Sequence, residues 1–188
     1  PFEAISVLID IYDKYLNECF KEKNYDVSEF LGVSLRDLED DYHLKRDIDA
    51  ILVKAMCESG RAVIQKEPDK VSELLENLEK RNKGVFHRVE MYMLRFVPAD
   101  AEKDRINRII ANTKFMESPF YKYEHRHLLN DKFDEVSKGT REKFTDWIRQ
   151  PKITEKKKEE KKQWCENNNR ELPDFEKWEN QKKEEELY

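Results

Sequence analysis

Apolar residues recur along most of the chain at the three- and four-residue spacing of a helix. The first such series consists of Phe2, Ile5, Leu8, Ile9, Tyr12, Leu16, Cys19 and Phe20. This spacing places one buried stripe along a helix over 2–20. The same pattern predicts helices over about 34–40, 43–66, 71–79, 85–96, 101–112, 119–133 and 140–148. With the tail included, the chain is predicted to be all-α, with about eight to nine helices.

The central stretch, 84–151, contains consecutive amphipathic segments. Residues 85–96 are apolar on nearly every side, which is typical of a helix enclosed by its neighbours. In the next helix, three isoleucines at helical spacing are expected to point inward, while Arg105 and Arg108 point outward. His125 and His127 follow in a segment where His127 is expected on the packed face. This stretch is therefore predicted to form the centre of the core.

Particular residues are expected to start, stop or weaken these helices. Gly84 is predicted to end the helix over 71–79 in the left-handed conformation that glycine tolerates. Pro119 suits the first position of a helix, and Thr140 offers an N-cap oxygen to the helix after it. Gly60 lies inside the helix over 43–66, where it costs about 1 kcal/mol relative to alanine.

Beyond Pro151 the chain becomes a highly charged tail with Lys and Glu in mixed blocks. Such a composition favours a solvated helix with pairs of opposite charge one turn apart. Trp164 and Trp178 can each bury roughly 200 Å² and would dock this tail. Without docking the tail would be partly disordered, and Pro173 is expected to start its last helix. The predicted organisation is a helical-repeat core over 1–151 and a docked or partly disordered tail over 152–188.

Composition supports a long helical protein. Of the 188 residues, 41% are charged and 38% hydrophobic, with four glycines and six prolines. This balance suits long exposed helices with a high ratio of surface to core, as in an α-solenoid of stacked antiparallel helix pairs. The formal net charge of −5 argues against a general nucleic-acid binder.

Several features bear on where the protein acts. No apolar run approaches the roughly 18 residues of a membrane span. From the residues before the first helix we expect no signal peptide. Three cysteines far apart in sequence are typical of reduced intracellular thiols. We therefore expect a cytoplasmic protein with no membrane partner. Because Pro1 is not an initiator methionine, we also expect the chain to be a segment of a longer protein.

Motifs for catalysis, cofactors or metals are missing from the sequence. It has no phosphate-binding loop of the P-loop or dinucleotide type. His125 and His127, two residues apart, would point about 200° apart on a helix, so they do not suit one metal ion. An enzyme that uses these histidines with Glu124 is the third hypothesis, while His43 and Cys57 are interpreted as structural. The prediction is therefore a protein with no catalytic residues, no cofactor, no metal and no small-molecule substrate.

Arginines in the central stretch form the one candidate interaction surface. They are Arg88, Arg95, Arg105 and Arg108. Acidic residues such as Glu90, Glu102 and Asp104 lie among them, which favours a solvated surface of mixed charge over a phosphate-binding track.

Four segments in order resemble a known family. They are SLRDLEDDYHLKRDIDAILVKA, GVFHRVEMYMLR, SPFYKYEHRHLLNDKF and SKGTREKFTDWIRQP. Together, over about 34–178, they resemble the C-terminal helical-repeat region of large prokaryotic STAND-type signal-transduction ATPases, some of them associated with antiphage defence. Two residue patterns carry the resemblance. Tyr123-Glu124-His125 precedes the pair Leu128-Leu129, and Trp147-Ile148 ends the repeat unit shortly before Pro151. The resemblance implies a HEAT-like or TPR-like α-solenoid outside the ATPase core. Because this chain lacks every nucleotide-binding motif, no ATPase activity is carried over to it.

These observations lead to one expected function and one alternative. The expected function is a non-catalytic scaffold or sensor segment that recognises a protein partner or the rest of its own longer chain. The alternative is a nucleic-acid-associated helical module that uses the local arginines.

Overall fold

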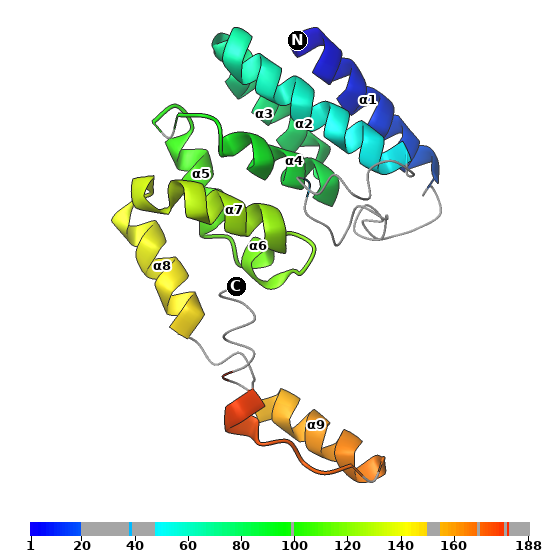
Figure 1. Cartoon of the computed structure of the whole chain (residues 1–188), viewed down its shortest axis with the longest axis vertical. Helices are drawn as coiled ribbons and strands as arrows, with labels where there is room; N and C mark the ends of the chain where they lie inside the picture. The colour runs from blue at the N-terminus through cyan, green and yellow to red at the C-terminus, as the bar shows by residue number, and fades with distance from the viewer. Residues whose placement is uncertain are drawn as a thin grey trace. The chain divides into compact units, whose positions relative to one another are not determined.

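The structure is a computed structural model that describes residues 1–19, 38, 48–98, 100–149, 155–168, 170–178 and 180. Every regular element in these ranges is helical, which confirms the all-α prediction. Apart from Leu38, the helix expected over 34–40 lies outside the described ranges. So do the first residues of the helix expected over 43–66, with His43. The elements are α1 Phe2–Cys19, α2 Ile48–Lys66, η2 Pro68–Lys70, α3 Val71–Arg81, α4 Gly84–Leu94, α5 Lys103–Ile110, α6 Thr113–Glu117, α7 Lys122–Lys132, η3 Phe133–Glu135, α8 Lys138–Arg149 and α9 Glu155–Asn167 (Figure 1).

The chain divides into two compact units, Pro1–Arg141 and Glu142–Tyr188. The division falls inside α8, earlier than the boundary at 151 that the sequence predicted. The first turn of α8 belongs to the first unit because Asn107 of α5 holds it there. The Asn107 Oδ1 atom accepts hydrogen bonds from the Ser137 backbone N–H, at 2.8 Å, and from the Thr140 hydroxyl, at 2.7 Å.

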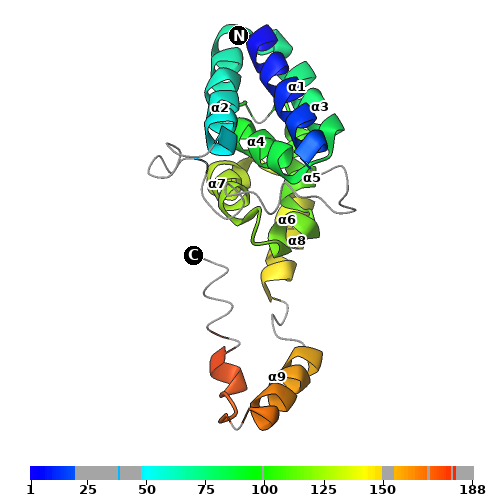
Figure 2. The same ribbon diagram turned by 90° about the vertical axis from the view of Figure 1, so that its right-hand side faces the viewer.

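In the first unit, α1 packs against both α2 and α3. The Phe2 N–H, at the start of α1, donates to Glu67, which follows the end of α2, so these two helices run antiparallel. In the second half of α1, Asp13 pairs with Arg81, the last residue of α3, and with Lys83, which precedes α4. Figure 2 shows the three helices side by side above α4. Stacking of antiparallel helices thus occurs locally, while a complete solenoid stays a prediction.

Helix α4 is the centre of the first unit, as its sequence predicted. It packs against α2, α3 and α7. All of its residues except His87 are buried, because neighbouring helices cover it on every side. The core extends from α4 to the stripe of α1, where Ile5, Ile9 and Tyr12 are fully buried.

The left-handed residue after α3 is Asn82, not Gly84. Asn82 has φ 48° and ψ 38°, and its N–H donates to the Glu79 carbonyl. Asparagine tolerates this conformation better than most residues. Gly84 is instead the first residue of α4 and has an ordinary negative φ.

Two glycines are needed for close packing. A Cβ atom on Gly84 would lie 2.5 Å from Cε1 of the buried Phe120 ring. A Cβ atom on Gly60, inside α2, would lie 2.0 Å from Cε of Met93. Gly60 therefore lets a side chain of α4 approach the α2 backbone, which explains why a residue of low helix propensity stands there.

Helix starts in the second half of the first unit differ from the prediction. An additional short helix, α6, begins after Asn112, whose side chain accepts from the Lys114 N–H as an N-cap. Pro119 lies in the turn before α7 and not at its first position. Ser137, not Thr140, caps α8, because the Ser137 hydroxyl accepts from the Thr140 N–H at 3.2 Å.

The second unit contains the end of α8, α9 and a helical turn over 175–178. Asp174 caps that turn by accepting from the N–H groups of Glu176 and Lys177, each at 3.1 Å. Trp178 lies against Phe175, with ring centroids 6.0 Å apart. Trp164 is 49% exposed, with the Lys161 ammonium 4.3 Å above its ring. Docking of this tail through Trp164 and Trp178 stays a prediction.

Candidate interaction surface

Arg88, the first of the predicted surface arginines, is in fact fully buried. Its guanidinium donates from Nε to Glu124 Oε2 at 2.6 Å and from Nη2 to Glu124 Oε1 at 2.8 Å. The side chains are 0% and 2% exposed. A bidentate ion pair of this kind is among the strongest charge-assisted hydrogen-bonding arrangements. It connects α4 to α7 and leaves Arg88 no access to a partner.

Two further contacts complete the surroundings of this pair. The Leu38 backbone N–H donates to Glu124 Oε1 at 3.1 Å. The Phe120 ring lies beside the guanidinium, with its centroid 5.2 Å from the Arg88 Cζ atom. These contacts compensate the carboxylate and the cation for the water they lose on burial.

Arg105 is also turned toward the protein, against the expectation that it points outward. It binds Glu79 and Glu90 through Nη1, both at 2.7 Å, and Glu102 through Nε at 3.0 Å. Burial alone would lower the pKa of Arg105, but hydrogen bonds to Glu90 and Glu102 outweigh it and raise the pKa. Glu90 is itself only 2% exposed and also lies 3.3 Å from the His87 Nδ1 atom. The cluster therefore ties α5 to α3 and α4.

The other two arginines are each paired with an acid. Arg108 binds Glu79 at 2.9 Å and remains exposed. Arg95 binds Asp131 of α7 at 2.5 Å and is 12% exposed. The four arginines thus do not form one exposed basic face, which corrects that part of the prediction. Acids from other helices reach all four of them, and sequence spacing alone does not show such approaches.

The histidines of α7 are placed the opposite way round from the prediction. His125 is buried at 4% exposure, while His127 is half-buried. Burial lowers the pKa of His125 to about 4, although hydrogen bonds to the carbonyls of Ile110 and Ile109 oppose the shift. Glu124, the acid of the enzyme hypothesis, is engaged by Arg88.

Within the described ranges no set of three or more His, Cys, Asp and Glu side chains is placed to hold a metal ion. Cys57 and Cys165 are both buried.

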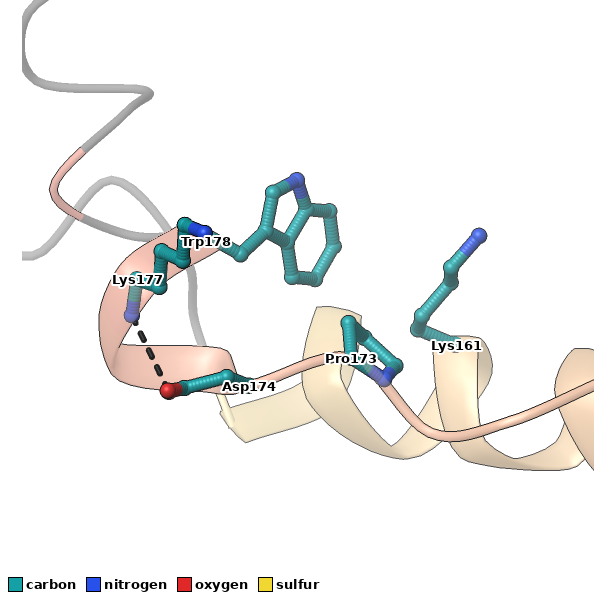
Figure 3. A pocket seen from close by; sticks show the side chains of 5 residues that line it. All are labelled: Lys161, Pro173, Asp174, Lys177 and Trp178. Carbon is teal, nitrogen blue, oxygen red and sulfur yellow. Dashed lines mark hydrogen bonds between the residues drawn. The ribbon is translucent and has the colours of Figure 1, made fainter.

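The second unit has a pocket of about 340 Å³. Figure 3 shows the Trp178 indole and the Lys161 side chain on either side of it, with Pro173 between them. Asp174 and Lys177 complete the lining, and the Asp174 carboxylate serves as the cap of the helical turn. The lining thus combines one aromatic ring with two ammonium groups and one carboxylate.

Exposed apolar side chains occur where the sequence pattern predicted none. Val7 and Ile11 of α1 are 55% and 50% exposed and lie one turn apart. They face away from the buried stripe that contains Ile5 and Ile9. At the start of α2, Ile48 and Ile51 are 62% and 52% exposed. The spacing of Val7 and Ile11 was the signal for a second apolar stripe on α1, opposite the first.

One more surface contact joins α2 to the residues after α4. The exposed Arg61 holds its guanidinium 4.5 Å from the centroid of the Phe96 ring. Arg95 lies 5.5 Å from the same centroid, and Tyr92 packs edge-on against the ring at 5.2 Å. Sequence reasoning missed this contact because Arg61 and Phe96 belong to different helical segments.

Comparisons with known proteins give no relative. No protein-family model matches the sequence, and neither curated proteins nor solved structures show a significant similarity to it. Among the described helices, none combines the length and apolar character needed to cross a membrane.

Proposed function

We propose that the chain is a non-catalytic helical scaffold that recognises a protein partner or another part of its own longer chain. The resemblance to the C-terminal repeat region of STAND-type ATPases motivates this proposal. We also propose that the protein is located in the cytoplasm. The observation that carries it is the apolar outer stripe of α1 formed by Val7 and Ile11, 55% and 50% exposed.

That stripe is unusual for a helix at the edge of a helical layer. A surface helix normally has one apolar stripe and a polar opposite face. In α1 the inner stripe already packs against α2 and α3, so Val7 and Ile11 add nothing to that core. Apolar residues grouped on the outer face favour burial against a further helix. Ile48 and Ile51, at the start of α2, are also exposed, at 62% and 52%.

The ion pairs are consistent with a supporting role for the rest of the unit. Arg88, Arg95 and Arg105 each bind an acid from another helix, so they stabilise the arrangement that presents α1. A scaffold needs a stable surface more than mobile reactive groups.

Site-specific photo-crosslinking in the native cells tests the proposal. A benzophenone amino acid at Ile11 should give a discrete cross-link to one partner or to another segment of the full-length protein. The Val7→Glu substitution should abolish that cross-link without unfolding the protein, because Val7 is 55% exposed. The same amino acid at Lys80, an exposed position on α3, is the control and should give no discrete product. Equal, diffuse cross-linking from both positions would refute the proposal.

A further inference from the structure

We propose that Arg61, held against Phe96, is an anchor for a carboxylate of an acidic segment on the protein partner. This inference rests on the proposed function and adds the chemistry of the partner. Its basis is the contact in which the Arg61 guanidinium lies 4.5 Å from the Phe96 ring centroid.

The Arg61 side chain is held against an aromatic ring. It forms no ion pair with any residue in the described ranges. By contrast, Arg88, Arg95 and Arg105 each have a carboxylate oxygen within 2.7 Å. Contact with an aromatic ring restricts the long side chain, so less entropy is lost when it binds. The donors of the guanidinium therefore remain available for an incoming carboxylate.

The ring that orders Arg61 is itself held in place. Tyr92 packs edge-on against Phe96, and Arg95, fixed by Asp131, lies 5.5 Å from the ring centroid. Two guanidiniums thus lie near one ring, and the described carboxylates neutralise only Arg95. An anion bound to Arg61 would reduce the repulsion between these two cations.

The surroundings favour an acidic protein segment over a nucleic acid. Arginine beside aromatic rings is typical of the residues that dominate protein–protein binding. A phosphate backbone requires a track of several unpaired cations. The paired arginines near this site do not supply such a track, and the whole chain carries a net charge of −5.

Nuclear magnetic resonance on the ¹⁵N-labelled chain tests the inference, with the Nε–Hε signal of Arg61 assigned by its loss in Arg61→Lys. The probe is an acetylated and amidated peptide of glutamate and alanine, and its glutamine counterpart is the control. The glutamate peptide should shift the Arg61 signal at millimolar concentration, and the glutamine peptide should not. Phe96→Leu should weaken the peptide's binding by about threefold, because the cation–π contact orders the arginine.

Arg126 is the matched internal control, since its guanidinium lies 5.7 Å from the centroid of Tyr123 on the same helix. An equal shift at Arg126, an equal response to the glutamine peptide, or no shift at Arg61 would overturn the inference. A larger shift with oligothymidylate than with the glutamate peptide would replace it with nucleic-acid binding. These outcomes leave the cross-link at Ile11 unaffected, so failure of the inference is distinguishable from failure of the proposed function.

Discussion

Arg88 and Glu124 form a bidentate ion pair inside the first unit, with donor–acceptor distances of 2.6 and 2.8 Å. The residues are 36 positions apart and belong to α4 and α7. Because neither charge reaches water, the pair specifies how these two helices meet more than it adds net stability.

Replacing one member of this pair should be strongly destabilising. Glu124→Gln removes the countercharge and leaves the Arg88 guanidinium buried, so the free energy of unfolding should fall by about 3 kcal/mol. Urea unfolding followed by circular dichroism measures it. The double substitution Arg88→Met with Glu124→Leu should recover much of the loss, since no buried charge remains. Asp131→Asn, in an exposed pair, should change the value by less than about 1 kcal/mol. Equal effects at Glu124 and Asp131 would contradict this account.

Gly84 should not tolerate a methyl group. In Gly84→Ala the new Cβ would lie 2.5 Å from the Phe120 ring, and overpacking of this kind costs about 1–3 kcal/mol. Gly139→Ala is the matched control because no atom lies within 4 Å of its added Cβ. That variant should be as stable as the parent or slightly more stable, because alanine has the higher helix propensity. Thermal unfolding compares the two, and a similar loss in both would show that the Phe120 contact is not the cause.

Stability should fall in mild acid because of His125. Its pKa is lowered from 6.5 to about 4 by burial, so between these values the unfolded chain binds more protons than the folded one. The contribution is present in full above pH 6.5 and is lost as the pH falls toward 4. Its size is about 3 kcal/mol.

Urea unfolding at several pH values tests this dependence. His125→Gln should flatten the decline in stability between pH 6.5 and 4. A parallel decline in the parent and in His125→Gln would assign the acid sensitivity to other groups.

Among the acids that bind Arg105, the buried Glu90 should contribute more to the free energy of unfolding than the exposed Glu79. Glu90 is 2% exposed and Glu79 is 36% exposed, although both lie 2.7 Å from Arg105. Glu90→Gln should therefore cost about 2–3 kcal/mol, and Glu79→Gln less than about 1 kcal/mol. Salt should weaken the Glu79 effect only, because exposed charges are screened. Unfolding in low and high sodium chloride provides the measurement, and the reverse order would show that burial does not set the energetics.

The helical pattern was readable from the sequence because it depends on neighbours three and four residues away. The stripe of Ile5, Ile9 and Tyr12 and the enclosed α4 follow from that local periodicity. Helix starts were less predictable. Ser137 and Thr140 both offer a capping oxygen, and the choice between them depends on where the backbone turns.

The candidate site depended on contacts that periodicity does not encode. The prediction that Arg105 points outward considered its helix without the neighbouring helices. In the structure, ion pairs with Glu90 and Glu102 draw the side chain inward. The burial of His125 in place of His127 has a similar cause, because the true start of α7 and the neighbouring α5 decide which side is covered.

By itself the sequence determined the all-α class, the enclosed central helix and the main apolar stripes, since these follow from the regular spacing of side chains on a helix. Only the tertiary structure decided that Arg88 pairs with Glu124, that Gly84 makes room for Phe120, and that Arg61 meets Phe96. Each of these contacts joins residues distant in sequence, so its energy depends on how the helices pack and on how much water they exclude.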